Sequence, residues 1–318
     1  MISQVFLSIK PVRLKKYFLL SLILMVVFTV QAQKSPQKEL IDSGILKAKL
    51  GDFNEAIKDF DKAVSLDSND AEPYYNRGIV RSELKDYSRA ISDFSKVIIL
   101  KPAYPEPYYN RGLAKDYLKD YVGAIRDYNT AISLKADYYD AYHNSGLAKF
   151  DMGLFQEAIN DFSRAITYKP DFSEAYYNRG LSRFNLHDFP GSIQDFNEAI
   201  KLDTTQYDYF SSRGAAKAAS GEYEDAAGDF SIAHSINPGD VNAGMNLALA
   251  YMYLKKYQLA IDVYDQVVWG NPSDGEALAN RGVAWHYLDE KNAACEDWKT
   301  ASALGSEKAR QYLLKFCE

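Results

Sequence analysis

The chain has 318 residues and a formal net charge of −6, and 25% of its residues are charged. The first 32 residues hold four basic side chains and no acid, so the remainder has 33 basic against 43 acidic residues, a net charge of −10. Binding to a nucleic-acid backbone requires clustered Lys and Arg, and anionic lipid also attracts basic surfaces. The composition therefore argues against nucleic acid and against a lipid surface as partners.

At the N-terminus, residues 1–32 are predicted to be an export signal peptide. Basic residues up to Lys16 precede the largely apolar run Tyr17–Val30, and the small residue Ala32 suits a cleavage site. The run is shorter than the roughly 20 residues that span a bilayer. We expect export to the periplasm or the extracellular space, with no membrane insertion after cleavage. An uncleaved N-terminal anchor is the alternative. Residues 33–36 are a short spacer.

Residues 37–308 contain eight copies of a 34-residue pattern without an inserted or deleted residue. A fixed period of this length indicates a stacked array, in which each unit buries its apolar face against its neighbours. Function is then expected to belong to a long surface. The blocks are Gln37–Asp70, Ala71–Tyr104, Pro105–Tyr138, Tyr139–Phe172, Ser173–Gln206, Tyr207–Asp240, Val241–Asp274 and Gly275–Lys308.

Each block is predicted to be a helix–turn–helix. In Ala71–Tyr104, two segments with helical spacing are separated at Lys85, and Pro102 ends the second. Glycine inside a helix costs about 1 kcal/mol relative to alanine, so a recurrent glycine needs a packing reason. Position 8 of the blocks holds Gly44, Gly78, Gly112, Gly146, Gly180, Gly214, Ala248 and Gly282. Position 24 holds Phe60, Phe94, Tyr128, Phe162, Phe196, Phe230, Tyr264 and Trp298.

This pattern resembles the tetratricopeptide repeat family, which has an aromatic residue at position 4, Gly at 8, Ala at 20 and 27, an aromatic at 24 and Pro near 32. The resemblance covers residues 37–308. It implies an all-α fold, a right-handed α-solenoid (superhelix) of helix–turn–helix repeats, with the first helices lining a concave groove. Residues 307–318, with Ser306 as N-cap, resemble the family's C-terminal capping helix, of which residues 309–318 lie beyond the repeats.

Recurrent charges distinguish this chain from the usual family pattern, which is apolar at positions 7 and 11. We predict that aspartates at position 23 pair with these bases, within a repeat or across to its neighbour; capture of an anion by the arginines is the alternative. Position 7 has Arg77, Arg111, Arg179, Arg213 and Arg281, and position 11 has Lys47, Arg81, Lys115, Lys149, Arg183 and Lys217. Position 23 has Asp59, Asp93, Asp127, Asp161, Asp195, Asp229 and Asp297. In repeat seven, Leu247, Tyr251 and Val263 replace all three charges.

The candidate partner-binding residues lie on the concave face implied by the resemblance, at positions 5 and 6. Amides can donate to and accept from a peptide backbone, and tyrosine supplies stiff contact area. The pattern is similar to the asparagine ladder of the repeats in O-GlcNAc transferase; the alternative is that these amides bond to neighbouring backbone. The residues are Asn76, Asn110, Asn144, Asn178, Asn246 and Asn280, with Tyr75, Tyr109, His143 and Tyr177.

Acids at position 2 border these residues, so we expect the partner to be a neutral or basic segment of another protein. The acids are Glu72, Glu106, Asp140, Glu174, Asp208 and Glu276. The Lys and Arg residues of the clamp with which other family members bind acidic C-termini are missing here.

No catalytic motif is found in the sequence. The four histidines lie in four different repeats, without the spacing of a metal site, and no phosphate loop or nucleophile elbow is present. We therefore expect no enzyme activity, no cofactor and no metal. Cys295 and Cys317 lie ten residues before and twelve after Gly305, which would place them at similar height in antiparallel helices. They form either a disulfide or two buried free thiols.

Together these features predict an exported, monomeric, non-enzymatic scaffold that holds an extended polypeptide segment in its groove. The alternative is a structural, assembly or chaperone component of an envelope or secretion complex, acting through its outer surface or through self-association.

Overall fold

A computed structural model describes residues 34–317, so the predicted signal peptide lies outside the described residues. These residues form two compact units, 34–171 and 172–317, which we describe separately. The first contains α1 (Pro36–Lys49), α2 (Phe53–Leu66), α3 (Ala71–Glu83), α4 (Tyr87–Leu100), α5 (Pro105–Tyr117), α6 (Tyr121–Leu134), α7 (Tyr139–Asp151) and α8 (Phe155–Tyr168).

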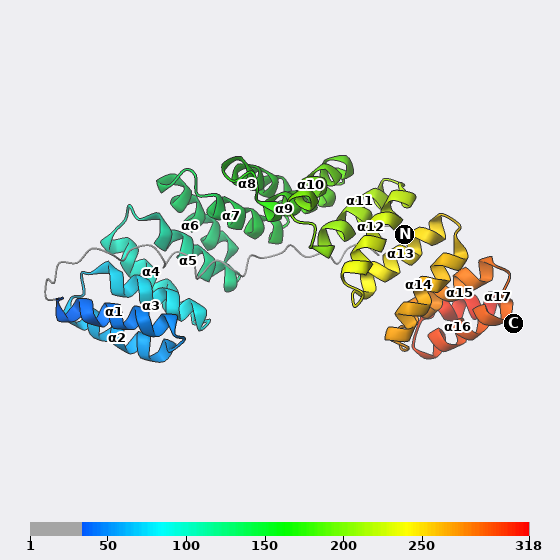
Figure 1. Cartoon of the computed structure of the whole chain (residues 1–318), viewed down its shortest axis with the longest axis horizontal. Coiled ribbons are helices and arrows are strands. Elements are labelled where there is room, and N and C mark those ends of the chain that lie inside the picture. Colours follow the sequence, from blue (N-terminus) through cyan, green and yellow to red (C-terminus); the bar gives the residue numbers. More distant parts are fainter. Residues whose placement is uncertain (1–33, 318) are drawn as a thin grey trace. The chain divides into compact units, whose positions relative to one another are not determined.

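The second unit continues with α9 (Ser173–Asn185), α10 (Phe189–Leu202), α11 (Tyr207–Ala219), α12 (Tyr223–Ile236), α13 (Val241–Tyr253), α14 (Tyr257–Gly270), α15 (Gly275–Tyr287), α16 (Lys291–Ala303) and α17 (Glu307–Phe316). In each unit, every helix packs on the next in chain order (Figure 1). Residues 34–317 contain no strand. The predicted all-α class and the solenoid arrangement of helix pairs are confirmed.

Local backbone chemistry explains the helix boundaries. Aspartate side chains cap several helices, as where Asp70 accepts a hydrogen bond of 2.9 Å from the Glu72 amide. Between the two helices of each pair, the residue at position 15 has a positive φ, which reaches 85° at Gly51 and 62° at Lys85. This left-handed residue ends the first helix and turns the chain into the second.

The glycine at position 8 allows close approach of the two helices of a pair. A Cβ atom added at Gly78 would lie 2.8 Å from Cε1 of Phe94, and one at Gly282 would lie 2.5 Å from Nε1 of Trp298. The rings of Phe94 and Trp298 are fully buried as a result. Glycine therefore recurs at position 8 because the aromatic ring at position 24 leaves no room for a larger side chain.

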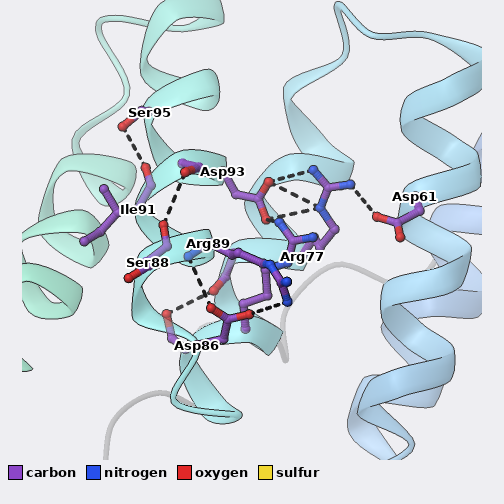
Figure 2. A network of polar contacts seen from close by, with 12 residues as sticks. Asp61, Arg77, Asp86, Ser88, Arg89, Ile91, Asp93 and Ser95 are labelled. Atoms are coloured by element: carbon purple, nitrogen blue, oxygen red, sulfur yellow. Dashed lines mark hydrogen bonds and ion pairs between the residues drawn. The ribbon is translucent and has the colours of Figure 1, made fainter.

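The predicted pairing of bases with the position-23 aspartates is confirmed. Asp93 on α4 accepts from Nη2 of Arg77 at 2.6 Å (Figure 2). It also accepts from Nη1 of Arg81 at 2.7 Å. The bonds lie within a repeat, and the same arrangement recurs at Asp127, Asp195 and Asp229. The arginine forks are thus bonded to carboxylates, which leaves the anion-capture alternative without support.

The same arginines also reach an aspartate at position 25 of the preceding repeat. Nη1 of Arg77 lies 2.5 Å from the Asp61 carboxylate on α2, at position 25 (Figure 2). Arg281 makes the equivalent contact with Asp265 at 2.7 Å. Each arginine therefore joins its own second helix to that of the repeat before it. In repeat seven, Leu247, Tyr251 and Val263 instead belong to an apolar cluster.

The C-terminal helix α17 covers the end of the second unit. Its residues Ala309, Leu313 and Phe316 pack against the cluster that contains Trp298 of α16. A disulfide joins Cys295 and Cys317, whose Cα atoms are 5.8 Å apart. Apolar packing and a covalent bond therefore both hold α17 against α16.

Candidate functional site

The candidate binding face consists of the side chains at positions 2, 5 and 6 of the first helices. Its predicted residues lie on six helices: Tyr75 and Asn76 on α3, Tyr109 and Asn110 on α5, His143 and Asn144 on α7, Tyr177 and Asn178 on α9, Asn246 on α13, and Asn280 on α15.

Asparagines and tyrosines of successive repeats are hydrogen-bonded to each other in the first unit. Nδ2 of Asn110 donates to the Tyr75 hydroxyl at 3.0 Å, and Nδ2 of Asn144 donates to the Tyr109 hydroxyl at 3.0 Å. In the second unit Ser212 stands where the asparagine would be, and its hydroxyl lies 3.2 Å from that of Tyr177. Positions 5 and 6 thus link neighbouring repeats.

The asparagine amides also bond to their own helices. Nδ2 of Asn76 donates to the carbonyl of Glu72 at 3.0 Å, and that of Asn144 donates to the carbonyl of Asp140 at 2.9 Å. This is the backbone bonding that the sequence left open as an alternative. The amide N–H groups are consequently engaged within the chain, whereas the side-chain carbonyl oxygen keeps its capacity to accept.

Tyrosine rings pack in pairs beside this face, and one pair, Tyr75 and Tyr104, lines a cavity. The Tyr75 and Tyr104 ring centroids are 5.5 Å apart, and those of Tyr109 and Tyr138 are 4.9 Å apart. Burial raises the pKa of Tyr75 and Tyr138 far above the ordinary value, so both hydroxyls remain protonated. The cavity, of about 640 Å³, is lined by Ala71, Glu72, Tyr75, Lys101, Pro102, Ala103 and Tyr104.

Three predicted contact residues are completely buried. His143, Tyr177 and Asn178 have 0% of their surface exposed, and burial lowers the pKa of His143 to about 3, so its ring is neutral. A side chain without exposed surface cannot touch a partner directly, and we correct the expectation for these three residues to a supporting role. The sequence pattern could not reveal this, because burial depends on how the repeats stack. Asn110, Asn144 and Asn246 retain 8–9% exposure.

The described residues contain no group of three or more His, Cys, Asp or Glu side chains that could hold a metal ion. Between residues 34 and 317, no helix has both the length and the apolar character needed to cross a membrane.

Family models of this kind of repeat match several segments along the chain. A model described as TPR repeat matches residues 46–85 and 146–186. Two models described as tetratricopeptide repeat match residues 71–104 and 105–138, and residues 212–276. The comparison with curated proteins gave no match.

Several solved structures are similar. MamA protein is 28% identical, with a TM-score of 0.51, over 53% of this chain and 92% of that chain. The C-terminal part of a TPR repeat-containing protein from Cytophaga hutchinsonii is 22% identical, with a TM-score of 0.66, over 75% of this chain and 99% of that chain. YrrB, a TPR protein described as having an unusual peptide-binding site, is 22% identical, with a TM-score of 0.52, over 58% of this chain and 95% of that chain.

Proposed function

Because the chain belongs to the tetratricopeptide repeat family, a scaffold fold that is typically non-enzymatic, we propose that it is an exported scaffold that binds an extended segment of a partner protein on the face formed by positions 2, 5 and 6. The partner segment is neutral or basic, and the scaffold acts as a monomer.

The observation that carries this proposal is the ordered row of polar and aromatic groups on the first unit. Asn110 and Asn144 are held in place by hydrogen bonds to Tyr75 and Tyr109, one repeat earlier. Groups that are fixed at regular intervals lose little freedom on binding, so an extended chain can bind along them without ordering the receptor first. The described peptide-binding site of YrrB is consistent with this use of the fold.

Export is proposed from the apolar N-terminal run and from the disulfide. Disulfides persist in oxidising compartments and are rare in the cytosol, and the Cys295–Cys317 bridge fits an exported protein. Periplasmic and extracellular locations both agree with this chemistry.

The test compares two triple-alanine variants in affinity capture from the native envelope fraction. One variant replaces the face residues Asn76, Asn110 and Asn144. The matched control replaces Asn54, Asn129 and Asn160, which are exposed on second helices of the same unit. We expect the face variant to lose proteins that the wild type and the control retain. Equal capture by both variants would contradict binding at this face.

An assembly component that acts through its outer surface is the second candidate. Light scattering across a dilution series separates it from the first, because a self-associating chain loses mass on dilution whereas a monomeric scaffold does not.

A further inference from the structure

We propose that Glu106 and Asn110 of α5 form a binding site for the ammonium group of a lysine in the partner segment. This inference rests on the proposed function and specifies the side chain that the face recognises.

The hydrogen bonds of the asparagine side chains fix the direction of their amide groups. A backbone carbonyl can only accept, so the bonds from Nδ2 of Asn76 to Glu72 and from Nδ2 of Asn144 to Asp140 define which side of each amide is nitrogen. Nδ2 of Asn144 also donates to the Tyr109 hydroxyl, and Nδ2 of Asn110 makes the equivalent bond to the Tyr75 hydroxyl. The group left for a ligand is in each case the acceptor Oδ1.

A carboxylate lies four residues before each of these asparagines, on the same face of the helix. Glu72, Glu106 and Asp140 precede the three asparagines by one helical turn, and an ionised carboxylate also only accepts. Each helix therefore presents an acceptor pair with one negative charge. The ligand that matches such a pair carries several N–H donors and a positive charge, as a lysine ammonium does.

Two lysines of the chain itself bind the asparagine or carboxylate of other repeats at positions 6 and 2. At the end of the second unit, Nζ of Lys308 donates to Oδ1 of Asn280 at 2.8 Å. Burial lowers the pKa of Lys308, and the charge of Glu276 opposes that shift. At the start of the first unit, Nζ of Lys38 donates to both carboxylate oxygens of Glu72, at 2.8 and 3.1 Å. These contacts show that the acceptor groups of this face accommodate an ammonium group.

Among the residues that the structure describes, the carboxylate on α5 is not neutralised by a cation of the chain, in contrast to that on α3. Glu72 is paired with Lys38. Burial raises the pKa of Asp140, and the charges of Lys169 and Lys135 partly oppose that shift. Glu106 has no ion pair within residues 34–317. The neighbouring tyrosine-lined cavity of about 640 Å³ can receive the aliphatic stem of a lysine. Lys101 also lines this cavity and opposes an incoming positive charge.

The test measures binding of two capped peptides to the ¹⁵N-labelled chain by NMR. One is acetyl-Gly-Lys-Gly-Lys-Gly-amide, and the other is the same peptide with Nε-acetyllysine at both lysines, which removes the ammonium groups. We expect the lysine peptide to shift the Asn110 side-chain amide signal and to bind at least about fivefold more tightly than the acetylated one. Glu106→Gln should abolish that preference, and Lys101→Met should tighten binding about twofold.

Glu157→Gln is the matched control, because it removes one exposed carboxylate from α8 in the same unit. Equal weakening by Glu157→Gln and Glu106→Gln would mean general charge attraction and would overturn the site. Equal affinity for the two peptides, still dependent on Asn144, would overturn the ammonium site while the scaffold function stands. Absence of binding by either peptide would also overturn the site, and the capture experiment above then decides the scaffold function independently.

Discussion

The Arg111 guanidinium binds the Asp127 carboxylate through two parallel hydrogen bonds, from Nε to Oδ2 at 2.8 Å and from Nη2 to Oδ1 at 2.6 Å. Lys115 adds a third contact, from Nζ to Oδ2 at 2.7 Å, and Asp127 is 4% exposed. One buried acid thus neutralises two bases that lie one helical turn apart.

Asp127→Ala should lower the free energy of unfolding by about 3–5 kcal/mol, because the two bases would remain partly buried without a counter-charge. Thermal or denaturant unfolding followed by circular dichroism measures the change. Asp137→Ala, at an exposed position between α6 and α7, serves as the control and should have little effect. An unchanged melting curve for Asp127→Ala would refute the importance of this ion pair.

The apolar version of the same site should recover the lost stability. Repeat seven places Leu247, Tyr251 and Val263 at these three positions, and they pack into an apolar cluster. The triple variant Arg111→Leu, Lys115→Tyr, Asp127→Val should therefore be more stable than Asp127→Ala alone, since no unpaired charge remains buried. The same unfolding experiment tests this expectation, and a triple variant less stable than the single one would contradict it.

Two glycine-to-alanine substitutions should change the free energy of unfolding in opposite directions. A Cβ at Gly112 would lie 2.7 Å from Cε1 of Tyr128, so Gly112→Ala should be destabilising by roughly 1–3 kcal/mol through overpacking. Gly228, inside α12, has no atom within 4 Å of an added Cβ, and Gly228→Ala should be stabilising by about 0.5–1 kcal/mol. Similar effects at both sites would show that packing against the ring does not explain the position-8 glycine.

Removing one buried hydroxyl should stabilise the second unit. The Tyr264 hydroxyl is buried and has no hydrogen-bond partner within the described residues, and burial raises the pKa of Tyr264. Tyr264→Phe should raise the free energy of unfolding by about 1 kcal/mol, because an unsatisfied buried hydroxyl costs that much. Tyr108→Phe is the comparison, since the Tyr108 hydroxyl donates to the Pro102 carbonyl at 3.1 Å and its removal should bring no gain.

His143 should make stability depend on pH. Burial lowers its pKa to about 3 in the folded chain, below the ordinary value of 6.5. Between these values the unfolded chain binds a proton that the folded chain does not, so this contribution to stability is lost as the pH falls below about 6.5.

His143→Tyr removes the titrating group. Tyrosine already occupies the equivalent position of three other repeats, as Tyr75, Tyr109 and Tyr177. From pH 7 to pH 5 the wild type should lose roughly 2 kcal/mol more stability than the variant. Parallel stability curves for the two proteins over this range would contradict the expectation.

The helix pairs, the glycine–aromatic contact and the Asp–Arg pairing could be predicted from the sequence because each depends on local spacing that recurs in strict register. Gly78 and Phe94 are 16 residues apart in one helix–turn–helix, and so are Arg77 and Asp93. Contacts of this kind follow from helical periodicity and one short turn.

The stacking of neighbouring repeats decided what the sequence could not. His143 and Asn110 occupy adjacent positions of the same repeat pattern, yet only the tertiary structure shows that the first is fully buried, whereas the second keeps 8% exposure and donates to Tyr75 of the preceding repeat. The same holds for Arg77, whose contact with Asp61 crosses from one repeat to the previous one. Side-chain burial and amide direction depend on which groups the neighbouring helix brings within reach, and helical spacing alone contains no information on that distance.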